Sequence, residues 1–156
     1  MNKKAIILWV ITFLWMGIIF SFSATTGDDS SSKSKRFTYE IINIIKKNEK
    51  ESQIHKQVEK ANPKIRKIAH AFEYAVLYIL VLLSLKETLK NTNKTYLIAL
   101  ILCVLYASTD EVHQLFVNGR SGELRDVVID TAGAVIGLLI YEIIKKASKK
   151  LKEIKG

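Results

Sequence analysis

The sequence predicts an all-α membrane protein: a polytopic bundle of four transmembrane helices, with one or two short interfacial helices in the first loop. Hydrophobic residues make up 49% of the 156 residues and are gathered into four long blocks. Lysines collect between and after these blocks, as expected beside an anionic membrane surface. The net charge of +9 therefore indicates membrane lipids rather than nucleic acid as the partner. The length fits one domain over residues 1–156.

The first block covers residues 5–22 and contains no charged side chain over 18 residues. A helix of this length spans roughly 27 Å, close to a hydrocarbon core of about 30 Å. A cleaved signal peptide is the alternative interpretation. The block is long for a signal peptide and carries both tryptophans of the chain, so a membrane span is favoured.

The extracytoplasmic loop over residues 23–67 begins with the polar, turn-like stretch "TTGDDSSSKSK". Residues 37–45 are amphipathic and predict an interfacial helix, and a second short helix is expected around Val58, before Pro63. For residues 48–62 a solvated charged loop is an equal alternative.

The other three blocks predict spans at residues 68–85, 95–117 and 127–144. The third is short over residues 95–109, and apolar residues up to Val117 extend it. In the fourth, Gly133 and Gly137 form a small-xxx-small pair that allows a neighbouring helix to approach closely. A soluble helical bundle is the alternative, but four uninterrupted apolar runs in so short a chain argue against it.

Lysine and arginine counts predict that both termini are cytoplasmic. The first segment carries 2, the loop over residues 86–94 carries 3, and the basic tail over residues 145–156 carries 6, which gives 2 + 3 + 6 = 11 inside. The short loop over residues 110–126 carries only 2. The first loop also carries 11, but it is long and contains six acids, and the rule weakens for long loops.

Polar side chains of chemical interest gather at one end of the predicted bundle. His70 and Glu73 share a helix face at spacing i, i+3, and Asp126 and Asp130 do so at i, i+4. Four spans bring the start of the second, the end of the third and the start of the fourth to one membrane face. The candidate residues are His70, Glu73, Asp110, Glu111, His113, Gln114, Arg120, Asp126 and Asp130.

Charge within or beside a membrane span is costly, so such residues usually pair with one another or line a wet cavity. We therefore expect this set to converge in one pocket at the outer face. Asp110 and Glu111 have the alternative of ending a helix at the headgroups, and Asp126 that of stabilising a helix N-terminus. Asp130 lies a full turn inside its apolar span, where neither explanation applies.

Four motifs follow one another in the segments "KIAHAFEYAVLYILVLLS" and "YASTDEVHQLFVNGRSGELRDVVIDTAGAVIG": H-x-x-E-Y, D-E-x-H-Q, G-R-x-G and D-x-x-x-D. Together with "IIFSFSATTGDDSSSKS", they make the chain resemble the VanZ-like family of small bacterial membrane proteins. The resemblance covers nearly the whole chain, and least the part between Thr38 and Asn62. It implies a bacterial plasma-membrane location and a link to glycopeptide resistance, to teicoplanin more than vancomycin. All nine candidate residues match the family's polar signature, but no settled reaction comes with it.

One chemistry open to these residues is catalysis at the outer leaflet on a lipid-linked or cell-wall substrate. His70 or His113 would be the base, oriented by Glu73 or Asp110, and Arg120 would hold a phosphate or carboxylate. Asp130 completes the catalytic candidates.

Two other uses of the same residues remain open. One is a metal site, for which the candidate ligands are His70, Glu73, His113 and Asp130. The other is a non-catalytic binder of a headgroup, a drug or a partner protein, with ligand contacts from Glu111, Gln114, Arg120 and Asp126. A purely structural ion-pair clamp is the alternative to all three.

Overall fold

A computed structural model of the protein describes residues 2–46, 50–89 and 93–155. These residues form α1 (Lys3–Ser23), α2 (Gly27–Ile45), α3 (Glu51–Leu89), α4 (Asn93–Gln114) and α5 (Leu124–Lys155). The helices α1, α3, α4 and α5 are long and apolar enough to cross a membrane. The predicted all-helical architecture with four candidate membrane spans is therefore confirmed.

The helix α3 lies at the centre of the bundle and packs against each of the other four helices. Its inward face supplies most of the core, including the fully buried rings of Tyr74 and Tyr78. Large apolar side chains on the outer faces of α1, α4 and α5 are exposed, among them Leu14, Leu105 and Leu139. A face of this kind is covered by lipid in a membrane protein, which is why helices apolar all round are stable here.

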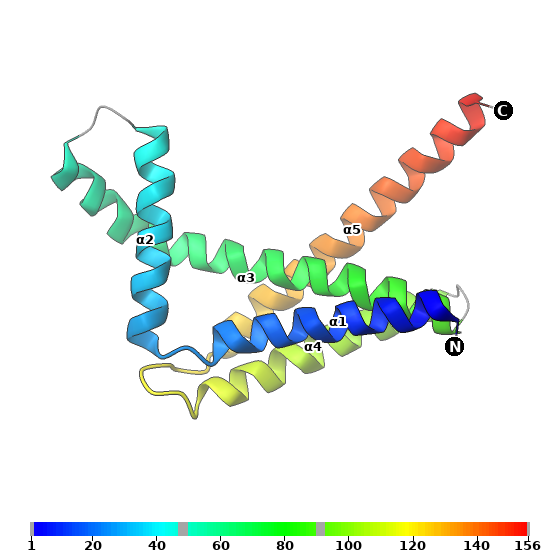
Figure 1. Cartoon of the computed structure of the whole chain (residues 1–156), viewed down its shortest axis with the longest axis horizontal. Helices are drawn as coiled ribbons and strands as arrows, with labels where there is room; N and C mark the ends of the chain where they lie inside the picture. The colour runs from blue at the N-terminus through cyan, green and yellow to red at the C-terminus, as the bar shows by residue number, and fades with distance from the viewer. Residues whose placement is uncertain (1, 47–49, 90–92, 156) are drawn as a thin grey trace.

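The helix α2 runs crosswise to the spans, at the end of the bundle where α1 finishes and α5 begins (Figure 1). The Asn62 side chain of α3 fixes it there by accepting hydrogen bonds from the hydroxyl groups of Ser34 and Thr38. This direction is the one expected of the interfacial helix that the amphipathic stretch predicts. Residues 48 and 49, the first two of the loop alternative above, lie outside the described residues.

The second half of the predicted first loop differs from the prediction. Residues from Glu51 onward belong to α3 and continue into the membrane span through Pro63, rather than forming a separate short helix. Proline removes one backbone hydrogen bond and crowds the preceding turn, so it bends a helix without ending it. Figure 1 shows the first turns of α3 inclined to the rest of the helix.

The predicted third span also ends earlier than expected, at Gln114 rather than Val117. The amides of residues 115–117 bond carbonyl groups only three residues back, which tightens the chain into turns. Gly119 follows with φ of 73°, a backbone conformation that glycine adopts without strain. The basic tail is helical, as the last turns of α5, and it diverges from the bundle (Figure 1).

The crossing of α3 and α5 is very close because small residues meet on both sides. A Cβ atom on Gly133 would clash with the backbone carbonyl of Ala71, and one on Gly137 with that of Ala75. The predicted close approach at the glycine pair is thus present, and its partner is α3.

The opposite end of the bundle is closed by a separate polar cluster. The Lys86 ammonium group donates to the hydroxyl groups of Tyr96 and Tyr141, each at 2.8 Å, and Tyr96 donates to Glu142 at 2.8 Å. These bonds join α3, α4 and α5 at the far end from α2. They lie outside the candidate site and tie the helices together.

Candidate functional site

The close crossing of α3 and α5 places Asp130 beside His70. His70 Nδ1 lies 3.8 Å from Asp130 Oδ1 and 4.0 Å from Glu73 Oε2. Asp130 is 0% exposed, and within the described part of the chain neither of its oxygens has a hydrogen-bond partner. Buried polar groups are almost always satisfied, so this carboxyl group stands out as one that structure alone does not explain.

The end of α4 contributes three buried polar residues that bond to one another. The Gln114 amide donates to Glu111 at 3.0 Å and to Asp110 at 3.4 Å. The second oxygen of Glu111 accepts the backbone N–H of Glu123 at 2.9 Å. Glu111 therefore fixes the start of α5 to the end of α4, which is a structural role. Asp110 keeps one buried oxygen, Oδ1, without a partner among the described residues.

Arg120 binds the corner between α1 and α2 rather than a carboxylate. Its Nε donates to the Thr25 carbonyl at 3.1 Å, and its Nη2 to the Phe22 carbonyl at 3.0 Å and the Ser30 hydroxyl at 2.8 Å. A basic side chain in this position satisfies the free carbonyl groups at a helix C-terminus. The expected ion pairs between Arg120 and the acids are not found among the described residues.

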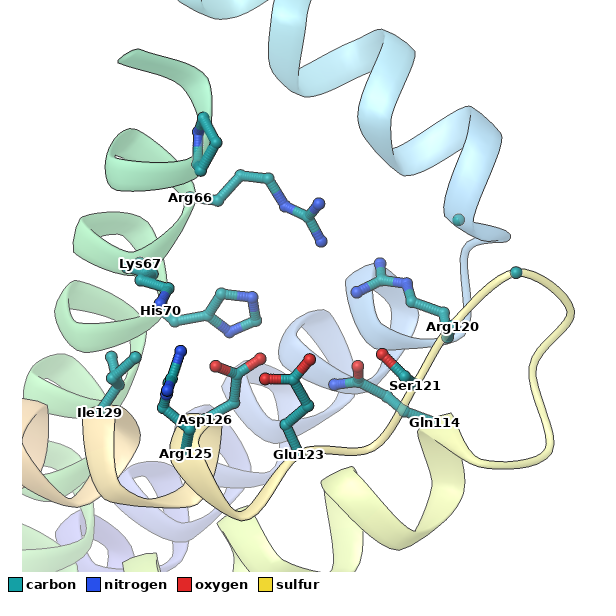
Figure 2. Close-up of a pocket in the computed structure, with 13 residues that line it drawn as sticks. Arg66, Lys67, His70, Gln114, Arg120, Ser121, Glu123, Arg125, Asp126 and Ile129 are labelled. Atoms are coloured by element: carbon teal, nitrogen blue, oxygen red, sulfur yellow. The ribbon is translucent and has the colours of Figure 1, made fainter. Parts of the chain in front are cut away.

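Arg66 on α3 faces Arg120, but Arg66 was not among the candidate residues predicted from the sequence. Burial lowers the pKa of the Arg120 guanidinium group from its ordinary value, and the positive charge of Arg66 acts in the same direction. Figure 2 shows both guanidinium groups pointing into one space, above the carboxylates of Glu123 and Asp126. Arg66 precedes His70 by four residues, so the i, i+4 spacing on the same helix face was the available signal.

Two cavities meet at this point. The loop cavity, of about 380 Å³, lies beside residues 119–126 and is lined by Arg66, Lys67, Arg120, Arg125, Glu123 and Asp126, among others. The α2 cavity, of about 400 Å³, lies between α2 and the spans and is lined by Phe22, Phe37, Ile65, Ser23, Glu73 and Asp110, among others. Arg66, His70 and Arg120 line both.

The structure therefore brings most, but not all, of the candidate residues together. Gln114 and Asp126 line the loop cavity, Glu73 and Asp110 line the α2 cavity, and Asp130 lies against His70. His113 lines neither cavity; its ring lies 4.4 Å from that of Phe20, centroid to centroid, on the α1 side of α4. His113 follows Asp110 by three residues on α4, yet of the two only Asp110 lines a cavity.

The four candidate metal ligands are divided by this arrangement. Among the residues that the structure describes, no group of three or more His, Cys, Asp or Glu side chains is placed to hold a metal ion. His113 packs against Phe20 of α1, whereas His70, Glu73 and Asp130 lie together where α3 meets α5. The four candidate ligands therefore do not form one cluster among the described residues.

A model of the VanZ/LLP1 family matches residues 8–145. The chain belongs to the VanZ/LLP1 family. No curated protein and no solved structure matches the chain. The match includes all nine candidate residues, Arg66 and the lining of both cavities, so the site lies wholly within the VanZ/LLP1 domain. The family resemblance seen in the four motifs is thereby confirmed.

Proposed function

We propose that this VanZ/LLP1 membrane protein binds an anionic group of a lipid-linked ligand of the cell envelope, at the junction of the loop cavity and the α2 cavity. The observation that carries the proposal is Arg66. Its guanidinium group lines both cavities, and it makes no hydrogen bond or ion pair with any described residue. A half-buried guanidinium group that faces a second one, with its donors free, is suited to bind an anion, although Glu123 and Asp126 supply negative charge to the same cavity.

Arg120 supports the same anion in a different way. Two of its nitrogens are held by backbone carbonyl groups and Ser30, so its position is fixed before a ligand arrives. Its charge then acts on the anion without a cost for ordering the side chain. Arg66 supplies the free donors, and the planar fork of donors suits a phosphate or a carboxylate.

The apolar wall of the α2 cavity favours a lipid-linked ligand over a soluble one. Phe22 and Phe37 line this cavity and are 59% and 62% exposed, at the end of the bundle where the crosswise helix α2 lies. An acyl or polyprenyl chain would cover these rings while its head reaches Arg66. We place this end of the bundle at the outer membrane face, because the lysine distribution predicts cytoplasmic termini.

The binding test compares Arg66→Gln with Lys60→Gln. Lys60 is an exposed basic residue on the same helix and lines neither the loop cavity nor the α2 cavity. Phosphatidylglycerol is the probe, added to the purified protein in detergent and followed by native mass spectrometry. Wild type should bind, and Arg66→Gln should bind about tenfold more weakly, since a hydrogen bond to a charged group contributes about 1.5–3 kcal/mol. Lys60→Gln should bind as wild type does. Equal binding by all three proteins would contradict the proposal.

A structural clamp is the second candidate function, and specific contacts favour it for two residues. Glu111 joins α4 to the start of α5, and Arg120 joins the loop to the end of α1. Both bonds tie helix ends together with no ligand required. They do not explain the free guanidinium group of Arg66 or the unpartnered oxygens of Asp110 and Asp130, so ligand binding ranks first.

Membership of the VanZ/LLP1 family also supports a proposed contribution to glycopeptide resistance, with teicoplanin as the drug to test. A site that binds an envelope lipid would change the lipids that surround the drug at the membrane. Susceptibility of cells carrying wild type, Arg66→Gln or Lys60→Gln would show whether resistance depends on the same residue as lipid binding.

A further inference from the structure

The α2 cavity has walls of three chemical kinds, and each kind restricts the ligand. Phe22, Phe37 and Ile65 form an apolar wall, and Arg66, Arg120 and Lys33 are basic. The third part, here named the acidic floor, consists of Ser23, Glu73 and Asp110. The proposed function uses the basic residues and the apolar wall, but it leaves the acidic floor without a role.

The acidic floor contains two buried polar groups that face each other, the Ser23 hydroxyl and the Asp110 carboxyl. Both residues are 3% exposed, and apart from this mutual contact Asp110 Oδ1 and Ser23 Oγ have no hydrogen-bond partner among the described residues. Glu73 adds a second carboxylate, with the His70 ring at 4.0 Å and Asp110 close enough to act on its charge. These groups come from three different helices, so the floor is assembled by the tertiary structure and is not an accident of one helix face.

A ligand group that completes this floor must donate hydrogen bonds and carry positive charge. A primary ammonium group offers three donors and one charge, which matches two carboxylates and a hydroxyl group. A quaternary ammonium group carries the charge but has no donor. A metal ion fits less well, since no three acidic, histidine or cysteine ligands converge among the residues described.

From the three walls together we infer that the α2 cavity takes a phospholipid with a primary ammonium group beside its phosphate. This inference rests on the proposed function, because the phosphate lies at Arg66 and Arg120. The ammonium group bonds Asp110, Ser23 and Glu73, and the acyl chains leave past Phe22 and Phe37. Cations and acids line the same cavity of about 400 Å³, as a headgroup with both charges a few bonds apart requires.

The test measures binding of three lipids with identical acyl chains: phosphatidylethanolamine, phosphatidylcholine and phosphatidylglycerol. The proteins are purified wild type, Asp110→Asn and Asp28→Asn, an exposed acid of α2 that lines neither cavity. Wild type should prefer phosphatidylethanolamine to phosphatidylcholine at least about tenfold, the effect of one hydrogen bond to a charged group. Asp110→Asn should lose most of that preference, and Asp28→Asn should keep it.

The outcomes separate this inference from the proposed function. If wild type binds all three lipids equally and Arg66→Gln weakens all three, the anion site stands and the ammonium site is wrong. If Arg66→Gln changes nothing, the proposed function itself is wrong. A preference that survives unchanged in Asp110→Asn also overturns the inference. Should Asp110→Asn fail to fold, Glu73→Gln and the wild-type preference between phosphatidylethanolamine and phosphatidylcholine decide the matter.

Discussion

Asp130 shows at the scale of one residue why the polar end of the bundle calls for a functional explanation. A buried carboxylate is normally retained because hydrogen bonds or a counter-charge offset its loss of hydration. Asp130 has the His70 ring at 3.8 Å and no hydrogen-bond partner among the described residues. By contrast, Glu111, on α4 at the same end of the bundle, is satisfied on both oxygens. Glu111 therefore stabilises the fold, whereas Asp130 is kept buried by the fold around it.

We predict that Asp130→Asn leaves the protein folded but impairs binding. The substitution preserves shape and removes a buried charge that forms no hydrogen bond, so the melting temperature in detergent should stay the same or rise. Binding of phosphatidylethanolamine should fall about tenfold, because the ammonium group loses the negative charge of Asp130 behind His70. If the melting temperature falls together with binding, and Glu73→Gln does the same, the cluster is a structural clamp.

At the scale of the helices, the crossing of α3 and α5 determines the geometry of the site. Gly133 and Gly137 lie against the backbone of Ala71 and Ala75, one residue beyond His70 and Tyr74 respectively. The small residues set how closely the two helices approach, and this distance places Asp130 next to His70. The contact between these four small residues therefore sets both the packing of the two helices and the geometry of the site.

Gly133→Ala should therefore damage both stability and binding. The added Cβ would meet the backbone of Ala71, which cannot move aside as a flexible side chain can, so the helices must separate. Overpacking of this kind costs about 1–3 kcal/mol and should lower the melting temperature. Gly17→Ala is the matched control, because a Cβ there meets nothing within 4 Å. Equal melting temperatures for the two variants would show that the close crossing does not hold the bundle together.

The arrangement of the whole molecule relates the site to the membrane. The loop and α2 cavities lie at the end of the bundle where α1 finishes and α5 begins, and α2 crosses that end (Figure 1). Lys86 and its tyrosine partners close the opposite end. The two ends of the molecule thus differ in chemistry, and a ligand held at the cavities is reached from one membrane face only.

We predict that this face is the outer one, with both termini in the cytoplasm. A reporter fused after Gly156 should be active only in the cytoplasm, and one inserted in the loop between α4 and α5 only outside. The physical reason is the excess of basic residues in the tail, which carries six lysines, over residues 110–126, which carry two arginines. Reversed reporter activities would place the cavities at the inner leaflet and would require a cytoplasmic source for the ligand.

The amino-acid sequence sufficed to predict the class of protein, the four spans and the end of the bundle at which the polar residues gather. These properties follow from local rules: an apolar run of about 20 residues must cross a bilayer as a helix, and alternate crossings bring alternate ends together. The four motifs also sufficed to identify the VanZ/LLP1 family. Helix ends were less predictable, since the turns after Gln114 and the passage of α3 through Pro63 depend on bonds to other segments.

Which polar residues share a cavity depends on how the helices pack, and the sequence does not show it. Arg66 and Arg120 are far apart in the sequence, and no local spacing indicates that their guanidinium groups face each other. His113 has the spacing of a site residue, yet the rotation of α4 turns it toward Phe20. Helix rotation and crossing distance are set by packing between elements, above all by Gly133 and Gly137 against α3, and side-chain contacts across helices follow from that packing.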